Sequence, residues 1–200
     1  MSSSKPFSRK FYTQASPIVA ERLLGSYLHR ISDGVHLIGK IVETEAYGIG
    51  DEACHAFRGK TPRNEILFQE GGFSYVYFTY GMHHCFNVST NVEGLAEAVL
   101  IRAVEPIEGM EKMRLLRGKA TTPRELTNGP GKLCQAFGLT RSDNAVDLIE
   151  SEQLFITSAR PIAANLIGVS TRIGINVAKH YPWRFFIKGN EYVSRAKPSA

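Results

Sequence analysis

The sequence predicts a single α+β domain in which antiparallel hairpins are interrupted by a few helices. The chain has 200 residues, of which 43% are hydrophobic and 10% aromatic, enough to form one sizeable core. Eighteen Gly and nine Pro are too many for a helical bundle, and the Val, Ile, Tyr and Phe content favours strands. Strands that follow one another through turns predict an antiparallel sheet rather than an alternating parallel α/β fold.

The N-terminal segment predicts a loose arm followed by a short helix. Residues 1–10 are polar and basic, so we expect a flexible basic arm there and a single domain over 11–197, with Phe7 and Phe11 available to pin the arm to the body. Residues 16–25 begin with Ser-Pro, continue with apolar residues at helical spacing and end at a glycine, which predicts a helix.

Two hairpins come next. Alternating polar and apolar residues flank the turn at 32–34, and the second of these strands is expected to end at Tyr47. The second hairpin spans 73–90, turns at Tyr80-Gly81 and carries aromatic residues at alternate positions. Between the hairpins, residues 48–72 are rich in Gly, Pro, Asn and charge, and so long an excursion usually carries function.

The second half of the chain predicts two more helices and several strands. No internal repeat is present. The expected elements are a buried strand at 97–106, helices at 107–118 and 129–139 with a polar loop between them, and strands at 147–151, 153–158, 169–174 and 183–189.

Charge and cysteine content restrict the partner and the compartment. The net charge of +5 suits a polyanionic partner, although scattered cations also fit an ordinary basic surface. Cys54, Cys85 and Cys134 form no CxxC pair, which indicates reduced thiols. No stretch is apolar enough to cross a membrane and the first residues lack the order of a signal peptide, so we expect a cytosolic protein without a membrane partner.

A charged cluster is predicted where one strand ends. Glu43, Glu45 and Tyr47 share a face of their strand, just after the apolar run IGKIV. Arg102 lies within AVLIRAVEP, and a charge so flanked needs a carboxylate partner inside the fold. Glu43 or Glu45 would serve, and a glutamate held by arginine stays ionised, as a general base must. A solvated edge and a structural ion pair fit the same pattern.

Tyr80 and the histidines invite two further interpretations. An aromatic residue on an exposed turn has the shape of a wedge between base pairs, whereas core packing is the commoner fate of a tyrosine. His55, His83, His84 and Cys85 lack the spacing of metal ligands. We expect no metal and no cofactor.

Five segments of the chain resemble the alkyladenine (3-methyladenine) DNA glycosylase family, and its bacterial members in particular: IVETEAY, DEACHAFRGKTPRN, YVYFTYGMHHCFNVS, VLIRAVEP and NGPGKLCQAFGL. The resemblance covers residues 7–195 in the same order. It implies a single glycosylase domain with a curved antiparallel sheet, a protruding hairpin, peripheral helices and no metal. It also implies a monomer that flips alkylated or deaminated purines out of double-stranded DNA, such as 3-methyladenine, 7-methylguanine, hypoxanthine and ethenoadenine.

By motif, the resemblance makes Glu45 the general base that activates water, with Arg102 holding the water and the carboxylate. Cleavage of the bond between base and sugar passes through an oxocarbenium-like state, so one carboxylate can both stabilise positive charge and deprotonate water. No lysine lies within ETEAY, YVYFTYG or LIRA, so we expect no lyase activity.

The resemblance also implies the residues that hold the base. Tyr47 and Tyr77 would sandwich the flipped purine together with His55, and Asn87 would crowd the amino group of normal guanine. Tyr80 would be the wedge that fills the gap in the duplex. Stacking on aromatic faces recovers about 1–3 kcal/mol per base. A non-catalytic reader of damaged nucleic acid is the alternative function, and a metal-assisted nuclease lacks suitably spaced ligands.

Overall fold

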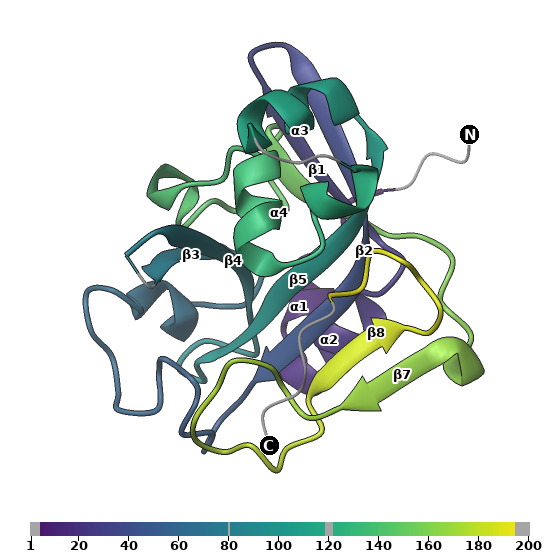
Figure 1. Ribbon diagram of the computed structural model, residues 1–200. Helices are drawn as coiled ribbons and strands as arrows, with labels where there is room; N and C mark the ends of the chain where they lie inside the picture. The colour runs from purple at the N-terminus through teal and green to yellow at the C-terminus, as the bar shows by residue number, and fades with distance from the viewer. Residues whose placement is uncertain (1–4, 80, 119–121, 195–200) are drawn as a thin grey trace.

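The computed structural model describes residues 5–79, 81–118 and 122–194, and its centre is an eight-stranded antiparallel sheet (Figure 1). The strands are β1 (Tyr27–Ser32), β2 (Val35–Tyr47), β3 (Ser74–Thr79), β4 (His83–Thr90), β5 (Glu97–Glu108), β6 (Leu154–Thr157), β7 (Ile167–Ser170) and β8 (Arg184–Ile187). The helices are α1 (Arg9–Tyr12), α2 (Ser16–Arg22), α3 (Met110–Arg117) and α4 (Pro130–Ala136). The predicted α+β fold with a curved sheet is confirmed.

Strand β2 is a central strand of the sheet and pairs with β1, β5 and β8. The strand order is β3-β4-β5-β2-β1-β6, and β8, with β7 beside it, adds to the C-terminal part of β2. The first half of β2 pairs with β1 through the predicted turn, where Asp33 and Gly34 both have positive φ, at 51° and 72°. Asp-Gly suits these angles because glycine has no Cβ and aspartate tolerates the left-handed region.

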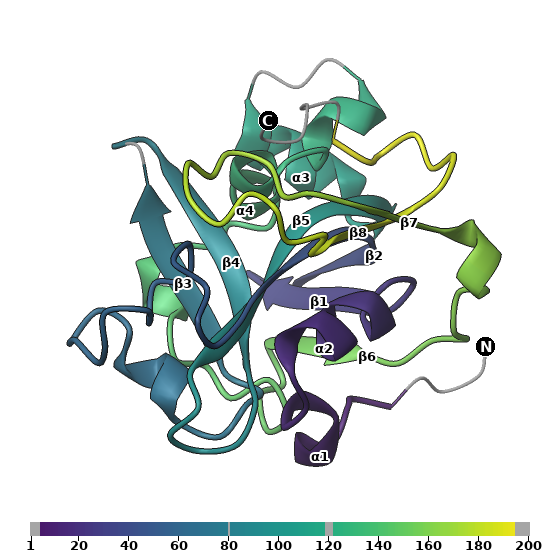
Figure 2. The ribbon, with the colours of Figure 1, turned by 90° about the horizontal axis from the view of Figure 1, so that it is seen from below.

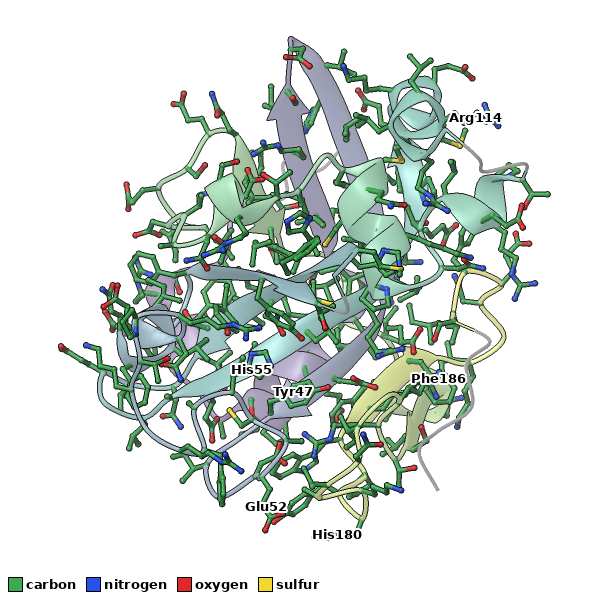
Figure 3. All side chains as sticks on the ribbon, turned by 60° about the vertical axis from the view of Figure 1, so that its left-hand side comes forward. Tyr47, Glu52, His55, Arg114, His180 and Phe186 are labelled. Carbon is green, nitrogen blue, oxygen red and sulfur yellow. The ribbon has the colours of Figure 1, made fainter. Side chains whose placement is uncertain are left out.

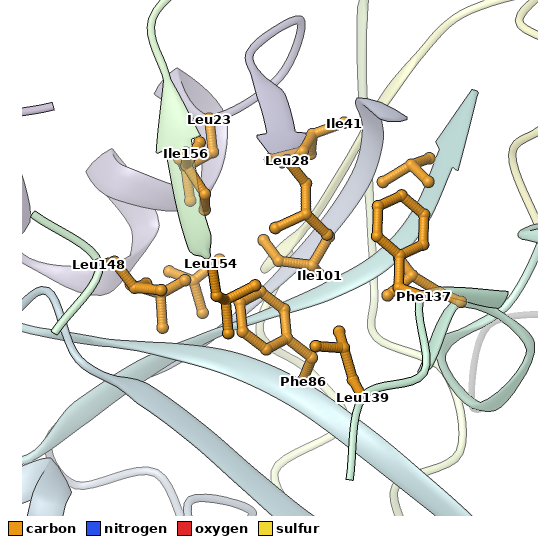
Figure 4. Close-up of a cluster of buried hydrophobic side chains, with 14 of the residues drawn as sticks. Leu23, Leu28, Ile41, Phe86, Ile101, Phe137, Leu139, Leu148, Leu154 and Ile156 are labelled. Carbon is orange, nitrogen blue, oxygen red and sulfur yellow. The ribbon is translucent and has the colours of Figure 1, made fainter. Parts of the chain in front are cut away.

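Helices cover the sheet on two sides: α1 and α2 lie on one side and α3 and α4 on the other (Figure 2). Most buried apolar residues of the sheet and of these helices form one large core (Figure 4). A second, smaller cluster contains Ile66, Leu67, Tyr75, Ala96 and Ala98. Gly39 of β2 makes close packing possible, because a Cβ at this position would lie 2.6 Å from Cγ2 of Val104 and 3.0 Å from the ring of Phe137. The core therefore fixes the two longest strands, β2 and β5, relative to each other.

Two predicted strands are wrong in part. Residues 147–151 form a turn, in which the side chain of Asp147 accepts a hydrogen bond from the Ile149 N–H, and only Asp147 bridges to Phe73. The strand expected at 169–174 ends at Ser170, because the following residues turn toward the end of β2. A side chain that caps its own turn, or bonds outside the ladder, overrides a strand-like pattern.

The segment 5–10 contacts the body of the protein. The rings of Phe7 and Phe11 stack with centroids 3.8 Å apart, and Arg9 pairs with Asp147. The boundary at residue 10 between arm and domain stays a prediction. Among the described residues, no helix is both long and apolar enough to cross a membrane, and the three cysteines are free and buried.

Candidate active site

A cavity of about 280 Å³ opens beside the C-terminal part of β2. Its wall comes from β2, β3, β4, β5, the loop after β2, the start of α4 and residues 173–175. This volume is close to the lower end of the range for small-molecule sites. Five of the residues predicted to form the site line it: Tyr47, His55, Tyr77, Asn87 and Arg102. Tyr47 and His55, which both line this cavity, are labelled in Figure 3.

Behind one wall, two fully buried carboxylates flank a single guanidinium. Arg102 places Nε 2.9 Å from Oε1 of Glu43 and Nη1 3.1 Å from Oε2 of Glu45. The predicted carboxylate partner of Arg102 is thus confirmed, with both glutamates in that role, and the interpretation as a solvated edge is wrong. Burial lowers the pKa of Arg102, but the two carboxylates outweigh this and raise it, so the guanidinium stays charged.

An irregularity in the sheet brings these charges together. The ladder between β2 and β5 shifts register on both sides of Glu43. Glu43 pairs with Ala103, and the next residue of β2, Thr44, pairs with Ile101. Arg102 therefore stands between two paired residues without an opposite residue in this ladder. Such bulges redirect a side chain, and here Arg102 reaches the two glutamates.

Glu43 is enclosed by Arg184 and by Ser194. Arg184 of β8 places Nε 2.7 Å from Oε1, the Ser194 N–H donates to Oε2 over 2.7 Å, and the Ser194 hydroxyl donates to Oε1 over 2.8 Å. Burial alone would raise the pKa of Glu43, but Arg102 and Arg184 lower it below its usual value. Glu43 is thus an ionised and fully satisfied carboxylate.

Glu45 is held by groups of the cavity wall. Its Oε2 accepts a hydrogen bond from the Tyr47 hydroxyl over 2.9 Å and contacts Arg102, and its Oε1 accepts from the Ile173 N–H over 2.7 Å. All three partners line the cavity. Burial and the neighbouring Glu45 raise the pKa of Tyr47 well above its usual value, so the phenol keeps its proton for this hydrogen bond.

The opposite wall is aromatic. The ring centroids of His55 and Tyr77 are 4.4 Å apart, and Nδ1 of His55 lies 2.8 Å from the hydroxyl of Tyr75. Arg63 lies over the Tyr77 ring, 5.5 Å from its centroid. Burial and Arg63 lower the pKa of His55, which favours the neutral imidazole. This wall therefore offers flat, uncharged faces.

Asn87 and two cysteines complete the described part of this wall. Asn87 donates a hydrogen bond to the carbonyl of Tyr75 over 3.1 Å, which fixes its amide next to the cavity. Cys85 lies opposite Tyr77 in the ladder, and Cys54 follows in the loop after β2. Burial raises the pKa of Cys54 to about 11, so this thiol is uncharged at neutral pH.

Apolar residues flank the tip of the hairpin between β3 and β4. Tyr80, the predicted wedge, lies outside the described residues. Its neighbours Phe78 and Met82 are 45% and 65% exposed, so both sides of the turn present apolar surface. Across 5–79, 81–118 and 122–194, no three His, Cys, Asp or Glu side chains form a cluster that could hold a metal ion.

Sequence reasoning missed the contribution of the segment after β7. Ile173 provides its backbone N–H, which no sequence pattern reveals. Arg172 lies in VSTRIG, where polar neighbours give no hint of burial, and Asp51 lies in the polar GIGDEACH; yet both are fully buried. A charge flanked by apolar residues is a sequence signal for burial, and Arg102 has such neighbours whereas Arg172 and Asp51 do not.

Comparisons with known proteins agree with one another. Residues 10–191 match the family model described as Methylpurine-DNA glycosylase (MPG). A protein of Carboxydothermus hydrogenoformans named "Putative 3-methyladenine DNA glycosylase" is 53% identical over 94% of this chain and 97% of its own length. Proteins with the same name from Francisella tularensis and Chlorobium luteolum are 46% and 45% identical, over 88% and 96% of this chain and 92% and 97% of theirs.

Proposed function

Because the chain belongs to the methylpurine-DNA glycosylase family, we propose that it hydrolyses the N-glycosidic bond of damaged purines with water activated by Glu45. The family is the one predicted from the sequence motifs, and it makes the protein a DNA glycosylase of DNA repair. The finer proposal is that the substrates are alkylated or deaminated purines, flipped out of double-stranded DNA by a monomer in the bacterial cytosol.

One observation carries the catalytic assignment: Glu45 is a buried carboxylate whose three polar partners all line the cavity. Arg102 is charged and forms an ion pair with it over 3.1 Å. An ionised carboxylate at this position stabilises the oxocarbenium-like sugar and accepts a proton from water. Arg102 would help to hold both the water and the carboxylate.

The cavity suits a flat guest. Tyr47 and Tyr77 line it from different strands, His55 adds an aromatic edge, and Asn87 is fixed at the wall. Chemistry on a base within a duplex requires that the base leave the stack, and aromatic faces replace the lost stacking. Asn87 would exclude normal guanine by crowding the amino group of that base. The sequence-based proposal for Tyr80 as the wedge agrees with the exposed apolar neighbours Phe78 and Met82.

The proposed reaction needs no amine nucleophile. Among the described residues of the cavity wall there is no lysine, which supports hydrolysis by water without cleavage of the strand. Borohydride trapping tests this point, because only a Schiff-base intermediate yields a stable adduct of protein and DNA. We expect no adduct, and a trapped adduct would refute the hydrolytic mechanism.

A single assay tests the proposed function. The protein is incubated, with and without EDTA, with duplexes that each carry one of the four damaged purines named above, and the released bases are identified by chromatography. We expect free base, an uncut abasic strand and no effect of EDTA. Binding without release would indicate a reader of damaged DNA, and EDTA-sensitive strand cutting would indicate a nuclease.

A further inference from the structure

Arg172 is fully buried and joins three segments that surround the cavity. Its Nη1 donates to the carbonyl of Ala46 over 2.9 Å, within β2. Its guanidinium forms an ion pair with the fully buried Asp51, in which Nη2 lies 2.9 Å from Oδ1. Nη2 also donates to the carbonyl of Ala178 over 3.1 Å. One side chain thus ties the end of β2, the loop that carries His55 and the loop after β7.

The same guanidinium lies against the ring of Tyr47. Cζ of Arg172 is 4.6 Å from the Tyr47 centroid, 5.4 Å from that of Trp183 and 6.0 Å from that of Tyr181. Tyr47 lines the cavity, whereas Arg172 is not among the described residues of its wall. Arg172 therefore contacts the Tyr47 ring without being among the described residues that line the cavity, and the stacked Tyr181 and Trp183 lie against the same guanidinium.

Arg172 also determines where one donor to Glu45 lies. The next residue, Ile173, donates its N–H to Oε1 of Glu45 over 2.7 Å. Adjacent Cα atoms are about 3.8 Å apart, so a shift of Arg172 moves this N–H with it. The orientation of the Tyr47 ring and the position of the Ile173 N–H thus depend on one anchored side chain.

We propose that Arg172, anchored by Asp51, is a positioning residue that aligns the stacking face of Tyr47 with the carboxylate of Glu45. This inference rests on the proposed function of the cavity. A buried ion pair adds little net stability, because the cost of removing both charges from water offsets their attraction. Stability alone therefore explains the Arg172–Asp51 pair poorly, whereas precise placement of two site groups requires a rigid fork such as guanidinium.

The test compares Arg172→Lys with Arg30→Lys in the full chain. Lysine keeps the charge but cannot reproduce the planar fork. Arg30 of β1 is the matched control, since it forms a largely buried ion pair with Asp143 (2.8 Å) and is not among the described residues of the cavity wall. Single-turnover excision is measured at a temperature at which all variants are folded, over a range of pH.

We expect Arg172→Lys to slow excision about 10- to 100-fold, whereas Arg30→Lys changes it less than about threefold. The acid limb of the pH–rate profile should also move to higher pH, since loss of the Ile173 N–H disfavours the charged form of the base. A merely structural role would leave this limb in place. Should Arg172→Lys not fold, Asp51→Asn, which keeps the shape of the side chain, is expected to cause the same changes to a smaller extent.

Three outcomes decide the inference. Either a wild-type rate or an unmoved acid limb in Arg172→Lys, or in Asp51→Asn if that variant is needed, would overturn it. An equal loss in Arg30→Lys would overturn it as well, because the effect would then be general. If the wild-type protein itself releases no base, the proposed function fails, and the inference about Arg172 fails with it.

Discussion

The Arg102 guanidinium contacts two carboxylates, Glu43 and Glu45, and the other partners of these two carboxylates differ. Glu43 and Glu45 are the same residue type on the same strand, both fully buried and both within 3.1 Å of Arg102. The remaining partners of Glu43 are Arg184 and Ser194, from β8 and the chain end. Those of Glu45 are the Tyr47 hydroxyl and the Ile173 N–H, which line the cavity.

This difference teaches that burial and pairing do not by themselves identify a catalytic carboxylate. Apart from Arg102, the donors to Glu43 belong to Arg184 and Ser194, which are not among the described residues of the cavity wall, so a substrate in the cavity does not meet them. A glutamate whose donors belong to a cavity wall can share them with a substrate. Substitutions on the two sides of Arg102 test the difference, from the largest expected effect to the smallest, and the pH dependence of stability tests it independently.

The largest effect is expected for Glu45→Gln. The substitution keeps the shape and the hydrogen-bonding capacity of the side chain but removes the base and its charge, so single-turnover excision should fall about 10²- to 10⁴-fold. Binding to a damaged duplex should survive, which a gel-shift titration checks. Should Glu43→Gln abolish excision while Glu45→Gln retains it, the catalytic assignment moves two residues upstream.

Glu43→Gln should affect mainly the free energy of unfolding. The neutral amide would leave Arg184 and part of Arg102 buried without an opposite charge, and breaking a buried ion pair typically costs about 3–5 kcal/mol. Urea unfolding measures this loss. Below the unfolding temperature, excision should be far less affected than in Glu45→Gln, and a loss of activity without a loss of stability would contradict the structural role of Glu43.

A smaller loss is expected for Arg184→Gln. Arg184 contacts Glu43 and the Ser170 hydroxyl, and after the substitution Glu43 still has Arg102 and Ser194. The unfolding free energy should fall by about 1–3 kcal/mol, as for the loss of a charged hydrogen bond. The excision rate should stay close to that of the wild type. A large loss of excision in this variant would mean that the Glu43 side takes part in the chemistry.

Much of the fold was predictable because its signals are local. The Asp33-Gly34 turn, the proline near the start of α2 and the apolar run of β5 each correspond to an element of the structure. The segment after Ser170 was not, because its course is determined by Arg172, which bonds to Asp51 at a separation of 121 residues. A pattern read along the chain contains no information about such a contact.

The candidate site, like the fold, was predictable from the sequence only in part. A charge within an apolar strand predicted that Arg102 needs a carboxylate, since the cost of an unpaired buried charge is large. The sequence could not choose between Glu43 and Glu45 on that ground, because the choice depends on Arg184, Ser194 and Ile173, which come from far along the chain. Only the family resemblance favoured Glu45, and its catalytic role stays a proposal.

The dependence of stability on pH separates Glu43 from a second buried group. His29 of β1 lies 3.0 Å from His36 and 2.8 Å from the Thr157 hydroxyl, and burial, with a further contribution from His36, lowers the pKa of His29 from 6.5 to about 4. Between pH 6.5 and about 4, the unfolded chain therefore binds a proton at His29 that the folded protein does not bind. Stability falls as the pH drops from 6.5 to 4, by at most about 1.4 kcal/mol per pH unit for one proton.

Glu43 changes the stability at lower pH than His29 does, since the pKa of Glu43 is lowered from the ordinary value of 4.5. Below that pH the unfolded chain takes up a proton before the folded protein does, so the contribution of Glu43 is lost as the solution becomes more acidic. Urea unfolding at a series of pH values should thus show that His29→Gln flattens only the part between 6.5 and 4, and that Glu43→Gln flattens only the part below 4.5. If Glu43→Gln leaves the acid part unchanged, Glu43 is not ionised in the folded protein, and the contrast between the two sides of Arg102 needs another cause.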